Sequence, residues 1–343
     1  MLNENAVCKK FTANGDPEAE KLLSDVLCEM KNTLDGSGLC VVLGGSYGRG
    51  DGGVRLDREN GILYNDLDFF VFAEKKSHGG ETLLKEISKK YEHELKVDVD
   101  FSALMTVKDI KNNASRLMMQ ELKRGYHLVC GRDLLAENLP EISAEHLPFS
   151  EACRLLLNRG MGLLLAGEKI AAGSDDTDFI LRNICKAILG AGDAMLISSG
   201  AYRWKLGERA ELIANSDLPD GWKNLYREAV EFKRAPHRQK KQDMVSYWHS
   251  VREFYLAASL RCFGSGKKEH IPKQIYKRCS ECGETSFKNY VKYCIKSRSF
   301  SAAKIYTAPA AALLAGEVFQ AVDKGEMSID RQSKLYRHWL IFN

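Results

Sequence analysis

The first 140 residues alternate between two spacings of apolar side chains, one typical of helices and the other of strands. Residues 17–34 carry apolar positions every three or four residues, which predicts a helix. Short apolar runs at 39–43 and 65–72 predict buried strands. Helices that alternate with strands indicate an α/β (α+β) domain with a mixed sheet, which we expect at 1–140. A further helix at 81–93 and a strand at 97–101 complete this pattern.

Beyond residue 140 the strand patterns nearly vanish and helical periodicity takes over. The segment 138–148 holds two prolines and several polar residues, which predicts a linker. We therefore expect a second domain at 141–343 that is α-helical and organised as a bundle. The segments with helical spacing are 151–166, 178–198, 209–215, 222–233, 244–263 and 308–322.

Two carboxylates lie two residues apart within the second apolar run. Asp66 and Asp68 point to the same face of a strand, roughly 6.6 Å apart along it, because strand side chains alternate. Like charges this close repel each other, and a cation between them relieves the repulsion. Asp98 and Asp100, again two residues apart, would supply a third carboxylate from a neighbouring strand. Such oxygen ligands suit Mg²⁺, and phosphate oxygens and water would complete its coordination shell.

A glycine-rich turn precedes the paired carboxylates. Gly44 and Gly45 follow the apolar run 39–43 and allow the backbone to approach a ligand, where its N–H groups can cradle phosphate. Ser46 adds a hydroxyl, and Arg49 adds a positive charge able to contact a phosphate. A helix that starts near Ser46 would direct its positive end at the same anion.

Each of these features alone has an ordinary explanation. A glycine cluster is often only a turn, and an Asp-x-Asp strand is often a solvated face. The order of glycine turn, paired carboxylates and later acidic strand is much harder to obtain by chance. Asp66 and Asp68 also lie in a strongly apolar run, where unpaired charges would be expensive. The combination favours a site that holds a nucleoside triphosphate together with divalent metal.

These residues resemble the polymerase-beta-type nucleotidyltransferase superfamily, which includes aminoglycoside nucleotidyltransferases, CCA-adding enzymes, poly(A) polymerases and antitoxin nucleotidyltransferases. The family pattern is a Gly-Ser turn, an Asp-x-Asp strand and a carboxylate on a later strand. A helix at 117–123 and a strand with a Gly-x-Asp turn at 126–133 resemble the end of the family domain, so the resemblance covers about residues 20–139. It implies that the helical domain holds the acceptor. The matching positions are Gly45 and Ser46, then Asp66 and Asp68, then Asp98 or Asp100.

Two departures from the family pattern bear on the site. The polar, glycine-rich segment 51–61 is longer than the usual connection, so it either shapes substrate selection or is a loop without a role. The family needs a single later carboxylate, and this chain offers two. Asp98, flanked by valines, fits the pattern better, and Asp100 stays as the alternative. In enzymes that modify small hydroxylated acceptors, this carboxylate takes the acceptor proton.

Composition adds limits to this interpretation. The 343 residues are 44% hydrophobic and 28% charged, as in an ordinary globular protein, and no apolar run is long enough to cross a bilayer. Ten cysteines scattered in apolar patterns suit a reducing compartment, so we expect a cytoplasmic protein without a membrane partner. Residues 1–150 hold 19 basic and 25 acidic side chains, a net of −6, which leaves +10 for 151–343 out of the total +4.

Function is expected to be transfer of a nucleoside monophosphate from a nucleoside triphosphate, with ATP as the expected donor, to a hydroxyl of a small molecule or protein. Pyrophosphate would leave, assisted by two Mg²⁺ ions, with Mn²⁺ as the substitute. One alternative is a nucleic acid acceptor, although no RNA-binding module is recognisable. Another is a non-catalytic, antitoxin-like or interaction protein that keeps the fold. Separately, Cys279 and Cys282, with His270 and Cys294 near them, either bind zinc or are ordinary thiols.

Overall fold

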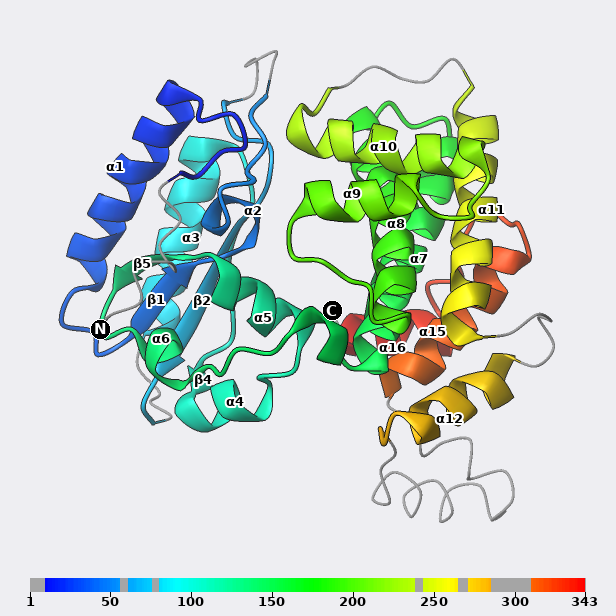
Figure 1. Ribbon diagram of the computed structural model, residues 1–343. Coiled ribbons are helices and arrows are strands. Elements are labelled where there is room, and N and C mark those ends of the chain that lie inside the picture. The colour runs from blue at the N-terminus through cyan, green and yellow to red at the C-terminus, as the bar shows by residue number, and fades with distance from the viewer. Residues whose placement is uncertain are drawn as a thin grey trace. The chain divides into compact units, whose positions relative to one another are not determined.

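The computed structural model describes residues 10–55, 61–75, 80–237, 243–264, 271–284 and 310–342 (Figure 1). The chain divides into two compact units. The first unit comprises Met1–Ile142 and Glu231–His237, and the second comprises Ser143–Val230 and Arg238–Asn343. The first division falls close to the boundary expected at residue 140. The return of 231–237 to the first unit leaves no mark in the sequence pattern.

The first unit is built on a small mixed sheet. Its strands lie in the order β3-β2-β1-β5, and β4 pairs with β2 beyond the end of β3. Strand β1 is antiparallel to both β2 and β5, whereas β2 is parallel to β3 and β4. The expected mixed α/β fold is therefore confirmed. The strands are β1 (Cys40–Leu43), β2 (Leu67–Ala73), β3 (Val99–Phe101), β4 (Met105–Thr106) and β5 (His127–Cys130).

Helices cover both faces of this sheet. Helices α1 (Pro17–Leu34) and α3 (Glu81–Leu95) pack on the face that carries Phe69 and Val71. The opposite face carries Val42 and Phe72. Because both faces are covered, β1 is buried along its whole length and reads as a continuous apolar run rather than an alternating one. The helices on this second face are α4 (Val107–Asn112), α5 (Leu117–Arg124) and α6 (Leu134–Asn138).

Local signals explain why α1 has the predicted bounds. Asp16 precedes it, and its carboxylate accepts a hydrogen bond from the Ala19 amide at 3.0 Å, which satisfies one of the free N–H groups of the first turn. Pro17 follows as the first helical residue, where its missing N–H costs nothing. The predicted helix at 17–34 is confirmed.

Helices are the only regular elements among the described residues of the second unit, which hold no strand, so the expected helical organisation is confirmed for them. Two buried side chains tie α11 to α7: the Trp248 indole donates to the Leu163 carbonyl, and the Tyr255 hydroxyl donates to the Leu156 carbonyl, each at 2.8 Å. No described helix is long and apolar enough to cross a membrane. The elements that lie at least partly in this unit are a 3-10 turn at Ala144–His146, α7 (Phe149–Ala171), α8 (Thr177–Ser198), α9 (Leu206–Ala214), α10 (Asp220–Arg234), α11 (Met244–Phe263), α12 (Ile271–Glu281), α15 (Ala310–Asp323) and α16 (Lys334–Phe342).

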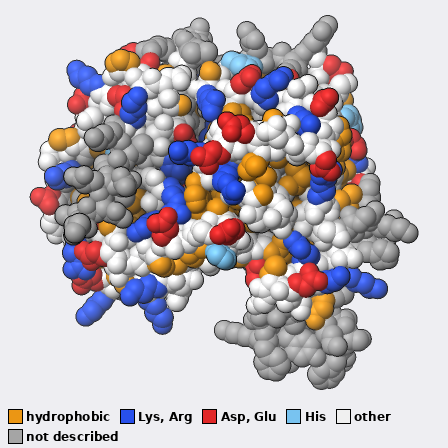
Figure 2. All heavy atoms as spheres, in the orientation of Figure 1, with side chains coloured by type: hydrophobic (Ala, Val, Ile, Leu, Met, Phe, Trp, Pro, Cys, Tyr) orange, Lys and Arg blue, Asp and Glu red, His pale blue; other side chains and the backbone are white. Residues whose placement is uncertain are grey.

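The surface carries charges of both signs. Figure 2 shows Lys and Arg side chains interspersed with Asp and Glu side chains on the face in view. This face therefore has no broad field of one sign, although the sequence divides its net charge unevenly.

Candidate active site

The paired carboxylates lie at the beginning of β2. Asp68 is the second residue of the strand, and Asp66 immediately precedes it. Leu67 and Phe69, which alternate with them, are buried in the core formed with α1 and α3. Asp66 and Asp68 are half-buried on the opposite face, as the period of two requires.

The neighbouring strand β3 brings the two later acids to the same face. In the parallel pair β2–β3, the register sets Asp68 opposite Asp100. Asp98 lies one residue before β3, where its carbonyl accepts a hydrogen bond from the Leu67 amide at 2.9 Å. Both later acids are exposed. The four carboxylates predicted from the sequence therefore share one face at one end of the sheet.

Electrostatics supports this proximity. The pKa of Asp100 is raised above its usual value, first by partial burial and then by the negative charges of Asp66 and Asp98. Glu92 on α3 adds a smaller contribution of the same sign. A carboxyl held among other carboxylates gains from any cation that enters the cluster, because the cation reverses this repulsion.

Asp66 and Asp68 offer two carboxylates to a divalent cation, whose other ligands would be water or phosphate oxygens. Within the described ranges, no group of three or more carboxyl, imidazole or thiol side chains is placed to hold a metal. Magnesium in nucleotide sites commonly uses one or two carboxylates and takes its other ligands from phosphate and water. Asp66 and Asp68, two apart on one face, meet that requirement. A metal contact of Asp98 remains a prediction.

The glycine turn is hydrogen-bonded to β2, the strand that carries Asp68. The Gly44 amide donates to the Asp68 carbonyl at 2.8 Å, directly after β1 ends at Leu43. Gly45 has a φ of +61°, and a Cβ on it would lie 2.1 Å from Oδ2 of Asp68. Only glycine fits there, since a side chain would collide with the carboxylate. The contact with Asp68 is one reason for glycine at this position, and close approach of the Gly45 backbone to a ligand remains a prediction.

The helix expected near Ser46 is present but very short. Helix α2 spans only Gly45–Gly48, and Ser46 in it is half-buried. Four residues are too few for aligned peptide dipoles to build up an appreciable positive end. The expected contribution of a helix dipole is therefore wrong. Contacts of phosphate with the Ser46 hydroxyl and the backbone of this turn remain a prediction.

Arg49 has a partner within the protein. Its Nη1 lies 3.2 Å from a carboxylate oxygen of Glu121 on α5, and both side chains are largely buried. In this arrangement the guanidinium holds α5 against the turn. A contact of Arg49 with a phosphate remains a prediction.

Tyr47, which the sequence analysis passed over, is central to this region. Its side chain is 1% exposed, and its hydroxyl donates to the Gly53 carbonyl at 2.8 Å. The same hydroxyl accepts from the amides of Tyr64 at 3.0 Å and Asn65 at 3.3 Å. In the sequence, only its position next to Ser46 indicated a role at the site. Once buried, its hydroxyl needs a hydrogen-bond partner, which the sequence pattern does not identify.

The long connection between the turn and β2 is partly ordered. Val54 pairs with Leu63 in an antiparallel bridge, and the Arg55 amide donates to the Ile62 carbonyl at 2.8 Å. Arg55 is buried, and its Nε donates to the Leu63 carbonyl at 3.0 Å. The base of this insert is thus a paired segment rather than an open loop. Its residues 56–60 lie outside the described residues.

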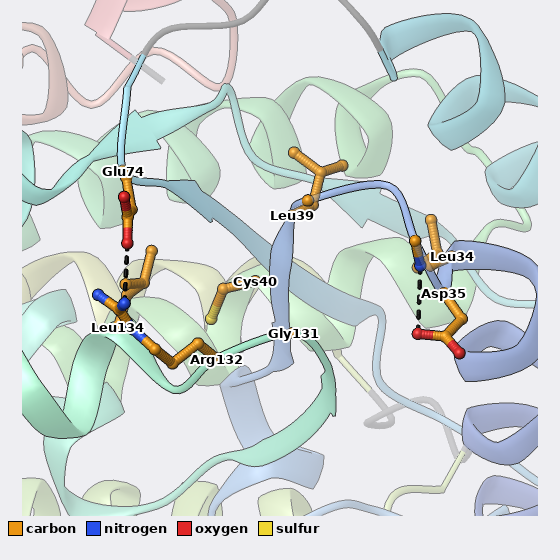
Figure 3. Close-up of a pocket in the computed structure, with 10 residues that line it drawn as sticks. Leu34, Asp35, Leu39, Cys40, Glu74, Gly131, Arg132 and Leu134 are labelled. Carbon is orange, nitrogen blue, oxygen red and sulfur yellow. Dashed lines mark hydrogen bonds and ion pairs between the residues drawn. The ribbon is translucent and has the colours of Figure 1, made fainter.

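A cavity of about 340 Å³ lies at the other end of the sheet. It opens where β1 begins at Cys40 and β2 ends before Glu74, roughly 20 Å along β2 from Asp68. Figure 3 shows Arg132 paired with Glu74 at its rim, and their atoms lie 2.9 Å apart. This cavity is separate from the carboxylates, and no sequence pattern indicated it.

The possible zinc site is only partly visible. Cys279 is buried near the end of α12, and Cys282 is exposed. Burial raises the pKa of the Cys279 thiol to about 12. His270 and Cys294 lie outside the described residues. The choice between a zinc site and ordinary thiols therefore remains a prediction.

Comparison with protein-family models found no match for this chain, and comparison with curated proteins found none.

Proposed function

We propose that this chain is a metal-dependent nucleotidyltransferase of the polymerase-beta type. The observation that carries the proposal is the register that sets Asp68 opposite Asp100, with Asp66 on the same face and the Gly44–Ser46 turn fastened to Asp68. This is the arrangement that a triphosphate with its metal needs: carboxylates on one side and a small-residue turn on the other. The donor would be a nucleoside triphosphate, with ATP expected.

Each residue has a defined task in this reaction. Asp66 and Asp68 hold the metal, and the turn at Ser46 holds the phosphates. Mg²⁺ held there would neutralise charge on the triphosphate and on the leaving pyrophosphate. The acceptor oxygen bonds to the α-phosphorus. At the same time, the bond breaks between that phosphorus and the oxygen that bridges it to the β-phosphorus. Pyrophosphate leaves with the electron pair of that bond.

The acceptor proton passes to a carboxylate, and we assign this role to Asp100. Asp100 lies within β3 directly beside Asp68, whereas Asp98 precedes the strand. The raised pKa of Asp100 also suits it to accept a proton. This choice differs from the sequence analysis, which favoured Asp98 on its flanking valines.

Transfer of label tests the proposal. The purified chain is incubated with ATP labelled at the α-phosphate, Mg²⁺ and cell extract, and protein, nucleic acid and small-molecule fractions are separated. We expect label in one fraction, and loss of that label with the double variant Asp66→Asn/Asp68→Asn. Asp25→Asn, which removes an exposed charge on α1, is the matched control and should transfer normally.

The outcomes separate the function classes. Label in nucleic acid would favour the nucleic-acid-directed alternative, and nucleotide binding without transfer would favour a non-catalytic protein. Full transfer by the double variant would exclude these carboxylates from the chemistry and with them the proposed mechanism.

A further inference from the structure

The hydroxyl of Tyr47 joins two segments that the proposed function requires to be held together. Tyr47 directly follows Ser46 in the turn, and Asn65 directly precedes Asp66. The Asn65 amide donates to the Tyr47 hydroxyl at 3.3 Å, and the Tyr64 amide donates to it at 3.0 Å. A single oxygen atom thus bridges from the phosphate turn to the residue next to the first carboxylate.

The insert closes this link from its other side. The Tyr47 hydroxyl donates its proton to the Gly53 carbonyl at 2.8 Å, and the Gly53 amide donates to Oδ1 of Asn65 at 2.7 Å. The three residues form a closed hydrogen-bonded ring, so movement of any one of them breaks a bond. Burial raises the pKa of Tyr47, which keeps the hydroxyl protonated as a donor to Gly53.

The tyrosine ring itself is fixed by close packing. A Cβ on Gly52 would lie 2.0 Å from Cδ1 of Tyr47, so the ring rests directly against the backbone of the insert. On its other side, Gly52 donates to the Phe11 carbonyl at 3.1 Å and accepts from the Ala13 amide at 3.0 Å. The segment at Phe11 and Ala13 therefore holds Gly52 against the ring, and this packing restricts rotation of the Tyr47 side chain.

We propose that Tyr47 is a positioning residue whose hydroxyl fixes Asp66 relative to the Ser46 turn and thereby sets the affinity of the carboxylates for a divalent cation. This inference rests on the proposed function, because it takes Asp66 and Asp68 as the metal ligands. It gives the long insert a purpose: the base of the insert is the frame that holds the hydroxyl in place. Groups that orient metal ligands typically change metal affinity by about 10- to 100-fold when they are removed.

The variant Tyr47→Phe tests the inference, since it keeps the ring and removes only the bridging oxygen. The probe is Mn²⁺ alone, with free ion measured by electron paramagnetic resonance. We expect the Kd for Mn²⁺ to rise about tenfold. The matched control is Tyr126→Phe, which also removes a buried hydroxyl from the first unit. That hydroxyl donates to Asp133, which follows β5, at 2.6 Å.

The control separates positioning from loss of stability. If only Tyr47→Phe weakens Mn²⁺ binding while both variants lose similar thermal stability, the inference is supported. Equal affinity of Tyr47→Phe and the unmodified chain would overturn it, and so would an equal weakening by both variants. If Tyr47→Phe does not fold, Asn65→Ala opens the same hydrogen-bonded ring by removing the acceptor of the Gly53 amide. Unchanged Mn²⁺ affinity in that variant would overturn the inference.

Failure of the proposed site gives a different signature. Asp66→Asn/Asp68→Asn should abolish the Mn²⁺ binding that Tyr47→Phe only weakens. Unchanged binding by the double variant would mean that the cation sits elsewhere, and the proposed function fails. Loss of binding in the double variant together with normal binding in Tyr47→Phe would leave the function intact and exclude the role of Tyr47.

Discussion

Gly45 and Asp68 are in such close contact that a methyl group on Gly45 would lie 2.1 Å from a carboxylate oxygen of Asp68. We expect Gly45→Ala to displace that carboxylate and to abolish transfer. It should also lower the free energy of unfolding by about 2–4 kcal/mol, of which about 1–2 kcal/mol comes from the positive φ. Thermal or urea unfolding, combined with the transfer assay, checks both effects.

The control for this substitution is Gly36→Ala. Gly36 has a φ of +75° and nothing within 4 Å of its potential Cβ, so it carries the backbone strain without the collision. It should cost only the strain and leave transfer intact. If the two variants behave alike, the crowding against Asp68 has no consequence.

Substitution by asparagine should affect kcat differently at Asp100 and at Asp98. Asp100→Asn removes the proposed proton acceptor, so we expect kcat to fall by about 10²- to 10⁴-fold with little change in KM. Asp98→Asn, outside the strand, should lower kcat far less. Steady-state kinetics with the acceptor identified by label transfer measures both, and the reverse order of the two effects would return the role to Asp98.

The stability of the metal-free protein should depend on pH through Asp100. Its folded-state pKa is raised above 3.8 by burial and by Asp66 and Asp98, so the folded protein binds this proton more tightly than the unfolded chain. This group therefore stabilises the fold below pH 3.8 relative to neutral pH, and that contribution is lost as pH rises through the raised pKa. We expect Asp100→Asn to raise the Tm at pH 7, and to raise it by less near pH 4.

Differential scanning calorimetry across this pH range checks the prediction. Asp25→Asn on α1 removes an equal charge from an exposed position and serves as the control. An equal gain from both variants at every pH would mean that only the net charge of the unit matters. Added Mg²⁺ should cancel the advantage of Asp100→Asn, since the cation relieves the same repulsion.

Elements with strong local signals could be predicted from the sequence. The bounds of α1 at Pro17–Leu34 and of α11 at Met244–Phe263 match the periodic segments, because a capping aspartate begins each helix and Gly264 ends α11. The carboxylates could be placed on one face because strand periodicity is invariant. Periodicity could not choose between Asp98 and Asp100, since both share a parity and only the register with β2 distinguishes them.

Features that depend on contacts distant in sequence could not be predicted. The short strand β4 at Met105–Thr106 exists only because it pairs with the end of β2. The role of Tyr47 depends on Gly53 and Tyr64, which lie 6 and 17 residues away along a segment without periodic pattern. Arg49 was expected to face a ligand, and only the packing of α5 shows that Glu121 is within reach. In each case tertiary structure supplies the partner that local sequence does not name.

The second unit holds a buried ion pair that should matter far more than an exposed one of the same chemistry. Arg209 Nε lies 2.9 Å from Oδ1 of Asp193, with the two side chains 6% and 13% exposed, and the Tyr226 hydroxyl donates to the same oxygen at 2.8 Å. Asp193→Asn leaves the guanidinium buried without its counter-charge. We expect a loss of about 3–5 kcal/mol in the free energy of unfolding.

The exposed counterpart is the pair of Arg261 with Asp217, whose atoms lie 2.6 Å apart and whose side chains are 45% and 80% exposed. Asp217→Asn should cost less than about 1 kcal/mol, because water screens this pair and solvates either partner alone. Urea unfolding followed by tryptophan fluorescence suits the comparison, since Trp204, Trp222 and Trp248 all lie in the second unit. A small loss for Asp193→Asn would mean that water reaches Arg209 and that burial of the pair does not govern the stability of this unit.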